Sequence, residues 1–62
     1  MNAIRKGKYV EVKDSDGKSV TCKVLKKTGS LFETYYPVKY VDGKTHMMKV
    51  SLKCTDVIKV LD

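Results

Sequence analysis

The chain has 62 residues, of which 42% are hydrophobic and 32% charged, and its formal net charge at pH 7 is +6. A chain of this length forms one domain at most and buries only about 60% of the surface that it exposes when unfolded, so its core is thin. This size argues against an enzyme with several buried catalytic groups and favours a domain that binds through its surface.

The basic residues are concentrated in the first half of the chain. Eight of the 13 basic residues, but only three of the seven acidic ones, fall within residues 1–30. A field of this sign attracts phosphate backbones, anionic membranes or acidic proteins, although lysines also keep small domains soluble and protect sheet edges. Twelve of the 13 are Lys, whereas the reading of base sequence relies on the forked side chain of Arg. The charge therefore favours contacts with phosphates.

The sequence gives no sign of secretion or of membrane insertion. The segment MNAIRKGKYV lacks the apolar stretch of a signal peptide, and no apolar run approaches the ~20 residues that span a bilayer. Two cysteines, Cys22 and Cys54, are too few for a disulfide-rich secreted scaffold. We expect a soluble cytoplasmic protein with no membrane partner, as a monomer or homodimer.

A hairpin is predicted over residues 8–27, around the turn Asp14-Ser15-Asp16-Gly17. A type I turn followed by Gly17 in the left-handed conformation makes a three-residue loop that pairs Asp14 with Lys18. One face of the two strands then carries Val10, Val12, Val20, Cys22 and Val24. The opposite face carries Tyr9, Glu11, Lys13, Thr21, Lys23 and Leu25. Turn chemistry and apolar pattern agree on this register.

A second hairpin is predicted over residues 31–53, interrupted by Pro37, which cannot donate to a ladder and marks a bend or an open stretch. The two-residue turn usual for Asp-Gly would mix polar and apolar residues on both faces. A three-residue loop that pairs Tyr40 with Lys44 sorts the faces better, and we prefer it. The expected core face then carries Phe32, Tyr36, Val38, Tyr40, His46, Met48, Val50 and Leu52. The other face carries Glu33, Tyr35, Lys39, Val41, Thr45, Met47, Lys49, Ser51 and Lys53.

The C-terminal residues complete the expected fold. Cys54-Thr55-Asp56 indicates a short turn or one 3₁₀ step, and residues 57–61 form a brief β-branched strand. Signals for helices are almost absent, because Ala occurs once and no long window has a 3.6-residue period. The sequence predicts a single all-β domain over residues 1–62, with five strands arranged as a small barrel.

This arrangement resembles the SH3-like small barrels, a group that includes KOW-type and Tudor-type domains. The similarity is carried by Gly7-Lys8 before Val10 and Val12, by Asp16-Gly17-Lys18, Val20 and Val24, and by the strand Val57-Ile58-Lys59-Val60 after a short turn. In size and lysine content the chain is also similar to the small archaeal chromatin proteins with SH3-like folds. The resemblance implies a five-stranded SH3-like barrel and a role in binding, and the small chromatin proteins imply contact with DNA.

Residues with catalytic or metal-binding chemistry are few. His46 is the only histidine, and both cysteines fall on the expected apolar face, where a thiol is inert. The spacing of His46, Cys22 and Cys54 is unlike that of a zinc site, and Asp14–Leu25 lacks the final Glu of a calcium loop. We expect no enzyme activity, no cofactor and no metal. A disulfide between Cys22 and Cys54 stays open.

The aromatic residues divide between the two faces. Phe32, Tyr36 and Tyr40 are expected in the core, whereas Tyr9 and Tyr35 lie outward among lysines. Outward tyrosines beside lysines are typical of single-stranded nucleic-acid platforms, and equally of protein interfaces.

The leading hypothesis is a small basic domain that binds DNA or RNA through its phosphates. The predicted nucleic-acid-binding residues are Arg5, Lys6, Lys8, Lys13, Lys23, Lys26 and Lys27 for charge, and Tyr9 and Tyr35 for stacking. The alternative is a protein-interaction module, such as a bacterial or phage accessory protein that docks on an acidic surface of a larger complex. A third possibility, a cage for methylated lysine, needs three aromatic side chains to converge.

Overall fold

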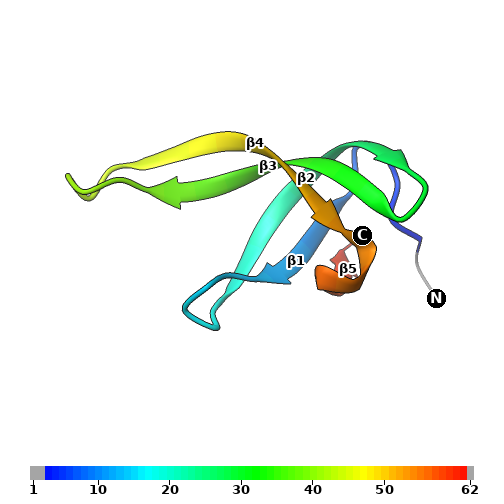
Figure 1. Cartoon of the computed structure of the whole chain (residues 1–62), viewed down its shortest axis with the longest axis horizontal. Helices are drawn as coiled ribbons and strands as arrows, with labels where there is room; N and C mark the ends of the chain where they lie inside the picture. Colours follow the sequence, from blue (N-terminus) through cyan, green and yellow to red (C-terminus); the bar gives the residue numbers. More distant parts are fainter. Residues whose placement is uncertain (1–2, 62) are drawn as a thin grey trace.

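Five strands and one short 3₁₀ helix make up the computed structural model, which describes residues 3–61 (Figure 1). They are β1 (Tyr9–Lys13), β2 (Ser19–Thr28), β3 (Leu31–Lys39), β4 (Thr45–Lys53), η1 (Cys54–Asp56) and β5 (Val57–Leu61). All five strands belong to one antiparallel sheet in the order β4-β3-β2-β1-β5. The predicted all-β class and the five strands are confirmed. The sheet is open, with β4 and β5 at its two ends, and is not closed into a barrel.

The first hairpin has the predicted loop and register. The amide of Asp14 donates to the carbonyl of Lys18 at 2.9 Å, and the amide of Gly17 donates back to the carbonyl of Asp14 at 3.1 Å. Gly17 has a φ of 79°, which is the left-handed conformation that the third loop position requires. Val10 therefore faces Cys22 and β1 presents its apolar side chains on one face.

The second hairpin has the register that we preferred for its sorting of the two faces. The amide of Tyr40 donates to the carbonyl of Lys44 at 3.0 Å, and that of Gly43 donates to the carbonyl of Tyr40 at 2.9 Å. β3 and β4 pair without interruption from the Leu31–Lys53 pair to the Lys39–Thr45 pair. The three-residue loop is confirmed, so its strands sort their side chains as expected.

A β-bulge shifts the pairing of β2 with β3. Val24 faces Thr34 and Lys26 faces Glu33, which leaves Leu25 without a partner on β3. Beside the bulge, the hydroxyl of Thr34 donates to the carbonyl of Lys23 at 2.6 Å. The bulge thus divides β2 into two parts. The part before Leu25 pairs with β1 as well as with β3, and the part after it pairs with β3 alone.

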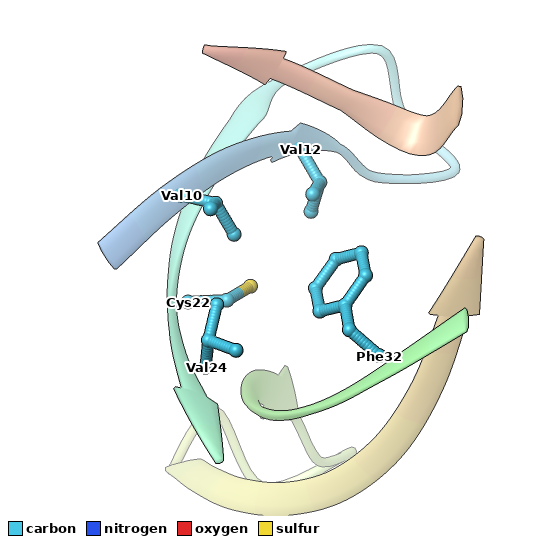
Figure 2. Packing of buried hydrophobic residues seen from close by; sticks show 5 residues of the cluster. All are labelled: Val10, Val12, Cys22, Val24 and Phe32. Carbon is cyan, nitrogen blue, oxygen red and sulfur yellow. The ribbon is translucent and has the colours of Figure 1, made fainter. Parts of the chain in front are cut away.

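The core lies on the inner face of the curled sheet (Figure 2). Its buried apolar side chains are Val10, Val12, Cys22, Val24 and Phe32, each at most 1% exposed. The ring of Phe32 comes from β3 and points toward the side chains of β1 and β2. Thr34, which we had not assigned to the core face, is also fully buried at 0% exposure. Cys22 and the half-buried Cys54 are both free thiols, so no disulfide joins them.

The far end of the second hairpin departs from the expected core. Tyr36 and Val38 are only half-buried, and Tyr40 is 45% exposed. The reason is that β2 pairs with β3 only as far as Tyr35, so residues 36–48 continue as a two-stranded ribbon beside which no third strand of residues 3–61 lies. We call residues 36–48 the arm; its tip extends away from the other strands (Figure 1). Tyr36, at the base of the arm, still packs against the core cluster, as predicted. The prediction that Tyr40, His46 and Met48 belong to the core was wrong, because all three are exposed.

Pro37 explains where the third strand stops. The amides of Tyr36 and Val38 point toward β4, because the hydrogen bond between Tyr40 and Lys44 sets that alternation along β3. Position 37 would therefore direct its amide toward β2, and a proline there cannot donate. The pairing of β2 with β3 ends two residues earlier, at Tyr35. β3 itself runs through Pro37, which pairs with Met47, so the predicted interruption of the strand was wrong and only the pairing with β2 stops here.

Candidate nucleic-acid interface

The outer face of the sheet, which is turned away from the core, carries most of the strand lysines. Alternation from the buried residues and the strand registers place seven lysines on this face, Lys13, Lys23, Lys26, Lys39, Lys49, Lys53 and Lys59. All seven are exposed. The acidic residues on the same face are Glu11 and Glu33. The outer face is therefore strongly basic.

Two tyrosines and two lysines line up across four strands of this face. Tyr9 on β1 faces Lys23 on β2, Lys23 faces Tyr35 on β3, and Tyr35 faces Lys49 on β4. We call these four residues the tyrosine–lysine row. Neighbouring strands lie about 4.8 Å apart, so the backbones of Tyr9 and Tyr35 are about 10 Å apart, with Lys23 on the strand between them. Aromatic rings and cations thus alternate along one line.

The side chains of the row are accessible to a ligand. Tyr9 is 48% exposed, Tyr35 is half-buried, and both lysines are exposed. The Nζ atom of Lys49 lies 5.9 Å from the centre of the Tyr35 ring, within the range of a cation–π interaction. This contact places the ammonium group over the ring. A base that stacks on the same face of Tyr35 would displace this ammonium group, whose flexible side chain would then be free to meet a phosphate.

Three aspartates accept hydrogen bonds from backbone amides in turns or at η1. Asp14 accepts hydrogen bonds from the amides of Asp16 and Lys18, both at 2.9 Å. Asp42 accepts from the amide of Lys44 at 3.0 Å, and Asp56 accepts from the amide of Lys53 at 3.0 Å. These carboxylates satisfy backbone donors of the loops and of η1. These three carboxylates therefore lie at the ends of the strands, and the acidic side chains on the outer face itself are Glu11 and Glu33.

The structure brings together five of the nine predicted binding residues. On the outer face lie Tyr9, Lys13, Lys23, Lys26 and Tyr35. Arg5, Lys6 and Lys8 belong to the turn before β1, in which the amide of Lys8 donates to the carbonyl of Arg5 at 3.1 Å. Lys27 faces Phe32 across the strands and so lies on the inner-face side, exposed at the end of β2. The four remaining residues therefore do not belong to the group on the outer face.

Lys49 is the member of the row that the sequence analysis did not include. The basic residues are concentrated in the first 30 residues of the chain, and Lys49 lies outside them. The preferred register of the second hairpin already paired Tyr35 with Lys49. That pairing could have identified Lys49 as a neighbour of Tyr35. The count of charges along the sequence pointed instead to the first 30 residues.

The residues with catalytic potential are dispersed. His46 is exposed near the tip of the arm, where its ring meets that of Tyr40 edge-on with centroids 4.0 Å apart. Burial raises the pKa of the Cys22 thiol, and a weaker opposing effect comes from its hydrogen bond with Thr34. Within residues 3–61, no cluster of three His, Cys, Asp or Glu side chains has the arrangement of a metal site. The cage hypothesis also lacks support, since Tyr9 and Tyr35 lie on one face and Tyr36 and Tyr40 on the other.

Tyr36 stands between two hollows on the inner side of the sheet. One, of about 420 Å³, lies between the Asp14 turn and the base of the arm, and the other, of about 330 Å³, reaches toward Leu52. Desolvation raises the pKa of Tyr36, followed by the charge of Asp14 and by Cys22. Both hollows are lined by a mixture of charged and apolar side chains, without a convergent set of polar groups.

Comparisons of the chain with protein-family models, with curated proteins and with solved structures found no match. The only helix within residues 3–61 is the three-residue η1, so none has the length and apolar character needed to cross a membrane.

Proposed function

We propose that this chain is a small, non-catalytic, cytoplasmic domain of the SH3-like class that binds nucleic acid on the outer face of its sheet. The observation that carries the proposal is the tyrosine–lysine row, Tyr9, Lys23, Tyr35 and Lys49. Its alternation of rings and ammonium groups matches the alternation of bases and phosphates in a single strand. The strand order β4-β3-β2-β1-β5 and the short 3₁₀ step before β5 support the SH3-like assignment.

The binding mode follows from the spacing of the row. A single strand crosses the sheet roughly perpendicular to the β-strands, with one base on Tyr9 and another on Tyr35. Because the two tyrosines lie on strands about 10 Å apart, these two bases are not stacked on each other, and Lys23 meets the phosphate between them. Lysines elsewhere on the outer face add attraction that does not depend on base sequence. We therefore expect single strands to bind more tightly than duplexes, whose bases are already stacked.

Fluorescence anisotropy with labelled single-stranded DNA, single-stranded RNA and a duplex tests this mode. Tyr9→Ala should weaken single-strand binding by about 5- to 150-fold, the range for the loss of one stacked base. Tyr40→Ala is the matched control, because Tyr40 is 45% exposed and Tyr9 48%, but Tyr40 lies on the opposite face. Affinity that is unmeasurable at low salt, or equal losses in both variants, would contradict the proposal.

The salt dependence tests the role of Lys49 separately. Each phosphate neutralised on a single strand contributes about −0.7 to the slope of log K against log salt concentration. Lys49→Gln should make this slope shallower by about that amount. Lys44→Gln removes the same charge in the loop at the tip of the arm and should leave the slope nearly unchanged. A salt-independent affinity would exclude binding through phosphates.

A second candidate is a protein-interaction module, which the apolar side chains of the arm favour. Val41 is fully exposed, Met47 is 56% exposed and Tyr40 is 45% exposed. Exposed aromatic and methionine side chains are enriched in protein interfaces. A partner captured from lysate that stays bound after nuclease treatment and high salt would support this function over nucleic-acid binding.

A further inference from the structure

The two ends of the sheet differ in how well they resist further pairing. β5 is a short edge of five residues, and its pairing with β1 has a register shift between Glu11 and Val12. β4 is an edge of nine residues that pairs with β3 without a shift and contains no proline. Short and bulged edges resist the addition of another strand, whereas long and regular ones invite it. The open edge of the sheet is therefore β4.

The two edges of the arm also differ in how well they resist further pairing. Pro37 removes an amide from the side of β3 that faces away from β4, so a strand cannot pair there regularly. Among residues 3–61, no strand pairs with the other side of the arm, the free edge of β4. One edge of the ribbon is blocked and the other is open.

The hydrogen bond at the hairpin loop determines which groups this open edge presents. Since Tyr40 bonds to Lys44, the even-numbered residues of β4 direct their amides and carbonyls toward β3. Thr45, Met47, Lys49 and Ser51 therefore direct theirs outward. An added antiparallel strand must hydrogen-bond to these odd-numbered residues.

We propose that the occupant of this edge is a second copy of the chain, paired antiparallel with β4 about a two-fold axis at Met48. Met48 then faces Met48 of the second copy in a pair without hydrogen bonds. On either side, Met47 faces Lys49 in a hydrogen-bonded pair, and further out Thr45 faces Ser51. The outward amides and carbonyls of both copies are thereby matched.

Side-chain chemistry favours this register and this occupant. On the inner face it joins apolar surface, because Met48 is 43% exposed and Val50 half-buried, and Val50 would face His46. On the outer face the Met47 side chain, 56% exposed, covers the stem of Lys49. A register centred on Lys49 would instead place two ammonium groups directly opposite, which destabilises a strand pair. In the Met48 register no like charges face each other across the two strands.

The dimer would be a ten-stranded sheet whose two outer faces are continuous. Its stability should respond to salt in the opposite sense to nucleic-acid binding. Each copy carries a net charge of +6, so added salt screens the repulsion between copies and strengthens association. The same salt weakens contacts with phosphates. This inference is thus independent of the proposed function, and the two fail in distinguishable ways.

Sedimentation equilibrium over a range of protein and salt concentrations tests the dimer. Met47→Pro removes one outward amide from each copy, and with it two hydrogen bonds of the dimer, but none that joins β4 to β3. It should weaken dimerisation by about tenfold or more while circular dichroism and thermal unfolding of the monomer change little. Met47→Ala keeps the amide and is the matched control for the lost side chain.

Cysteine cross-linking reads the register directly, in a Cys54→Ser background. Met48→Cys should form a disulfide-linked dimer under mild oxidation, because the facing pair brings its Cβ atoms within about 4.5–5.5 Å. Met47→Cys, whose partner is Lys49, should cross-link far more slowly. A chain that stays monomeric at every concentration and salt, with no cross-link at position 48, would overturn the proposal. Faster cross-linking of Val50→Cys than of Met48→Cys would overturn the register.

Discussion

The packed end of the sheet and the arm have the same local design but different environments. Both hairpins close with a three-residue loop that ends in glycine, and both alternate apolar and polar side chains. At the packed end, β1, β2 and the first half of β3 curl around Phe32, whereas the arm has only two strands. The same alternation therefore buries Val10 at one end and leaves Tyr40 45% exposed at the other. The alternation of apolar and polar residues determines which face a side chain lies on, but burial of that face requires a third strand beside the hairpin.

The largest expected effect breaks the packed end. Phe32→Ala removes the largest fully buried side chain and should lower the free energy of unfolding by about 3–5 kcal/mol. A domain this small has little stability in reserve, so much of the variant should be unfolded at room temperature. Tyr40→Ala on the arm should change the free energy by less than about 0.5 kcal/mol. Urea unfolding followed by circular dichroism measures both, and similar losses would contradict the comparison.

A smaller effect concerns the buried hydroxyl beside the bulge. Thr34→Val keeps the side-chain volume but leaves the carbonyl of Lys23 without the hydroxyl donor at 2.6 Å. The loss should be about 0.5–1.5 kcal/mol, the range for the net contribution of one hydrogen bond. Thr45→Val makes the same change at an exposed position of the arm and should be close to neutral. The same unfolding measurements apply, and a neutral Thr34→Val would show that water replaces the hydroxyl.

The smallest effect appears at alkaline pH, where Tyr36 links the arm to the packed end. Its pKa is raised above the usual 10.0 by desolvation first and then by Asp14, so the folded state favours the neutral phenol. The resulting stabilisation is fully present below pH 10.0 and is lost as the pH rises through the higher folded-state pKa. The pKa of the Cys22 thiol is also raised by burial, so its contribution to stability is fully present below pH 9.0 and is lost as the pH rises through its folded-state pKa.

Tyr36→Phe should therefore lose less stability than the parent chain between neutral pH and about pH 11. Urea midpoints measured across this range give the comparison, and Tyr40→Phe controls for the removal of a hydroxyl from the arm. Parallel pH profiles for Tyr36→Phe and the parent would show that burial at the base of the arm does not act on this phenol.

The sequence predicted the local parts of the fold better than the places where strands meet. For Asp14-Ser15-Asp16-Gly17, turn chemistry and alternation gave the same register, and for Asp42-Gly43 the alternation of apolar residues gave the register against the turn usual for Asp-Gly. How far β2 accompanies β3 is a tertiary property. It depends on the bulge at Leu25 and on Pro37, and the extent of pairing was not readable from alternation alone.

The candidate site shows the same division. Tyr9 and Tyr35 were assigned to the outer face from parity within their own hairpins. Their alignment through Lys23 depends on the β2–β3 register, which no single hairpin determines. Lys49 joined the row only when all four strands were placed side by side. Sequence reasoning therefore identified the kinds of residue in the site better than the complete set.

The unpaired Leu25 shifts the register of β2 against β3 by one residue. The turn into β3 pairs Thr28 with Leu31, and continued without interruption this frame would set Val24 against Tyr35. An inward side chain would then face an outward one, and the two hairpins would disagree about which side is the core. One extra residue in β2 restores the frame, so that Val24 faces Thr34 in the core and Lys23 faces Tyr35 outside. The composition of both faces thus depends on the number of residues in β2. A single insertion or deletion there would move the side chains on one side of the change to the opposite face of the sheet.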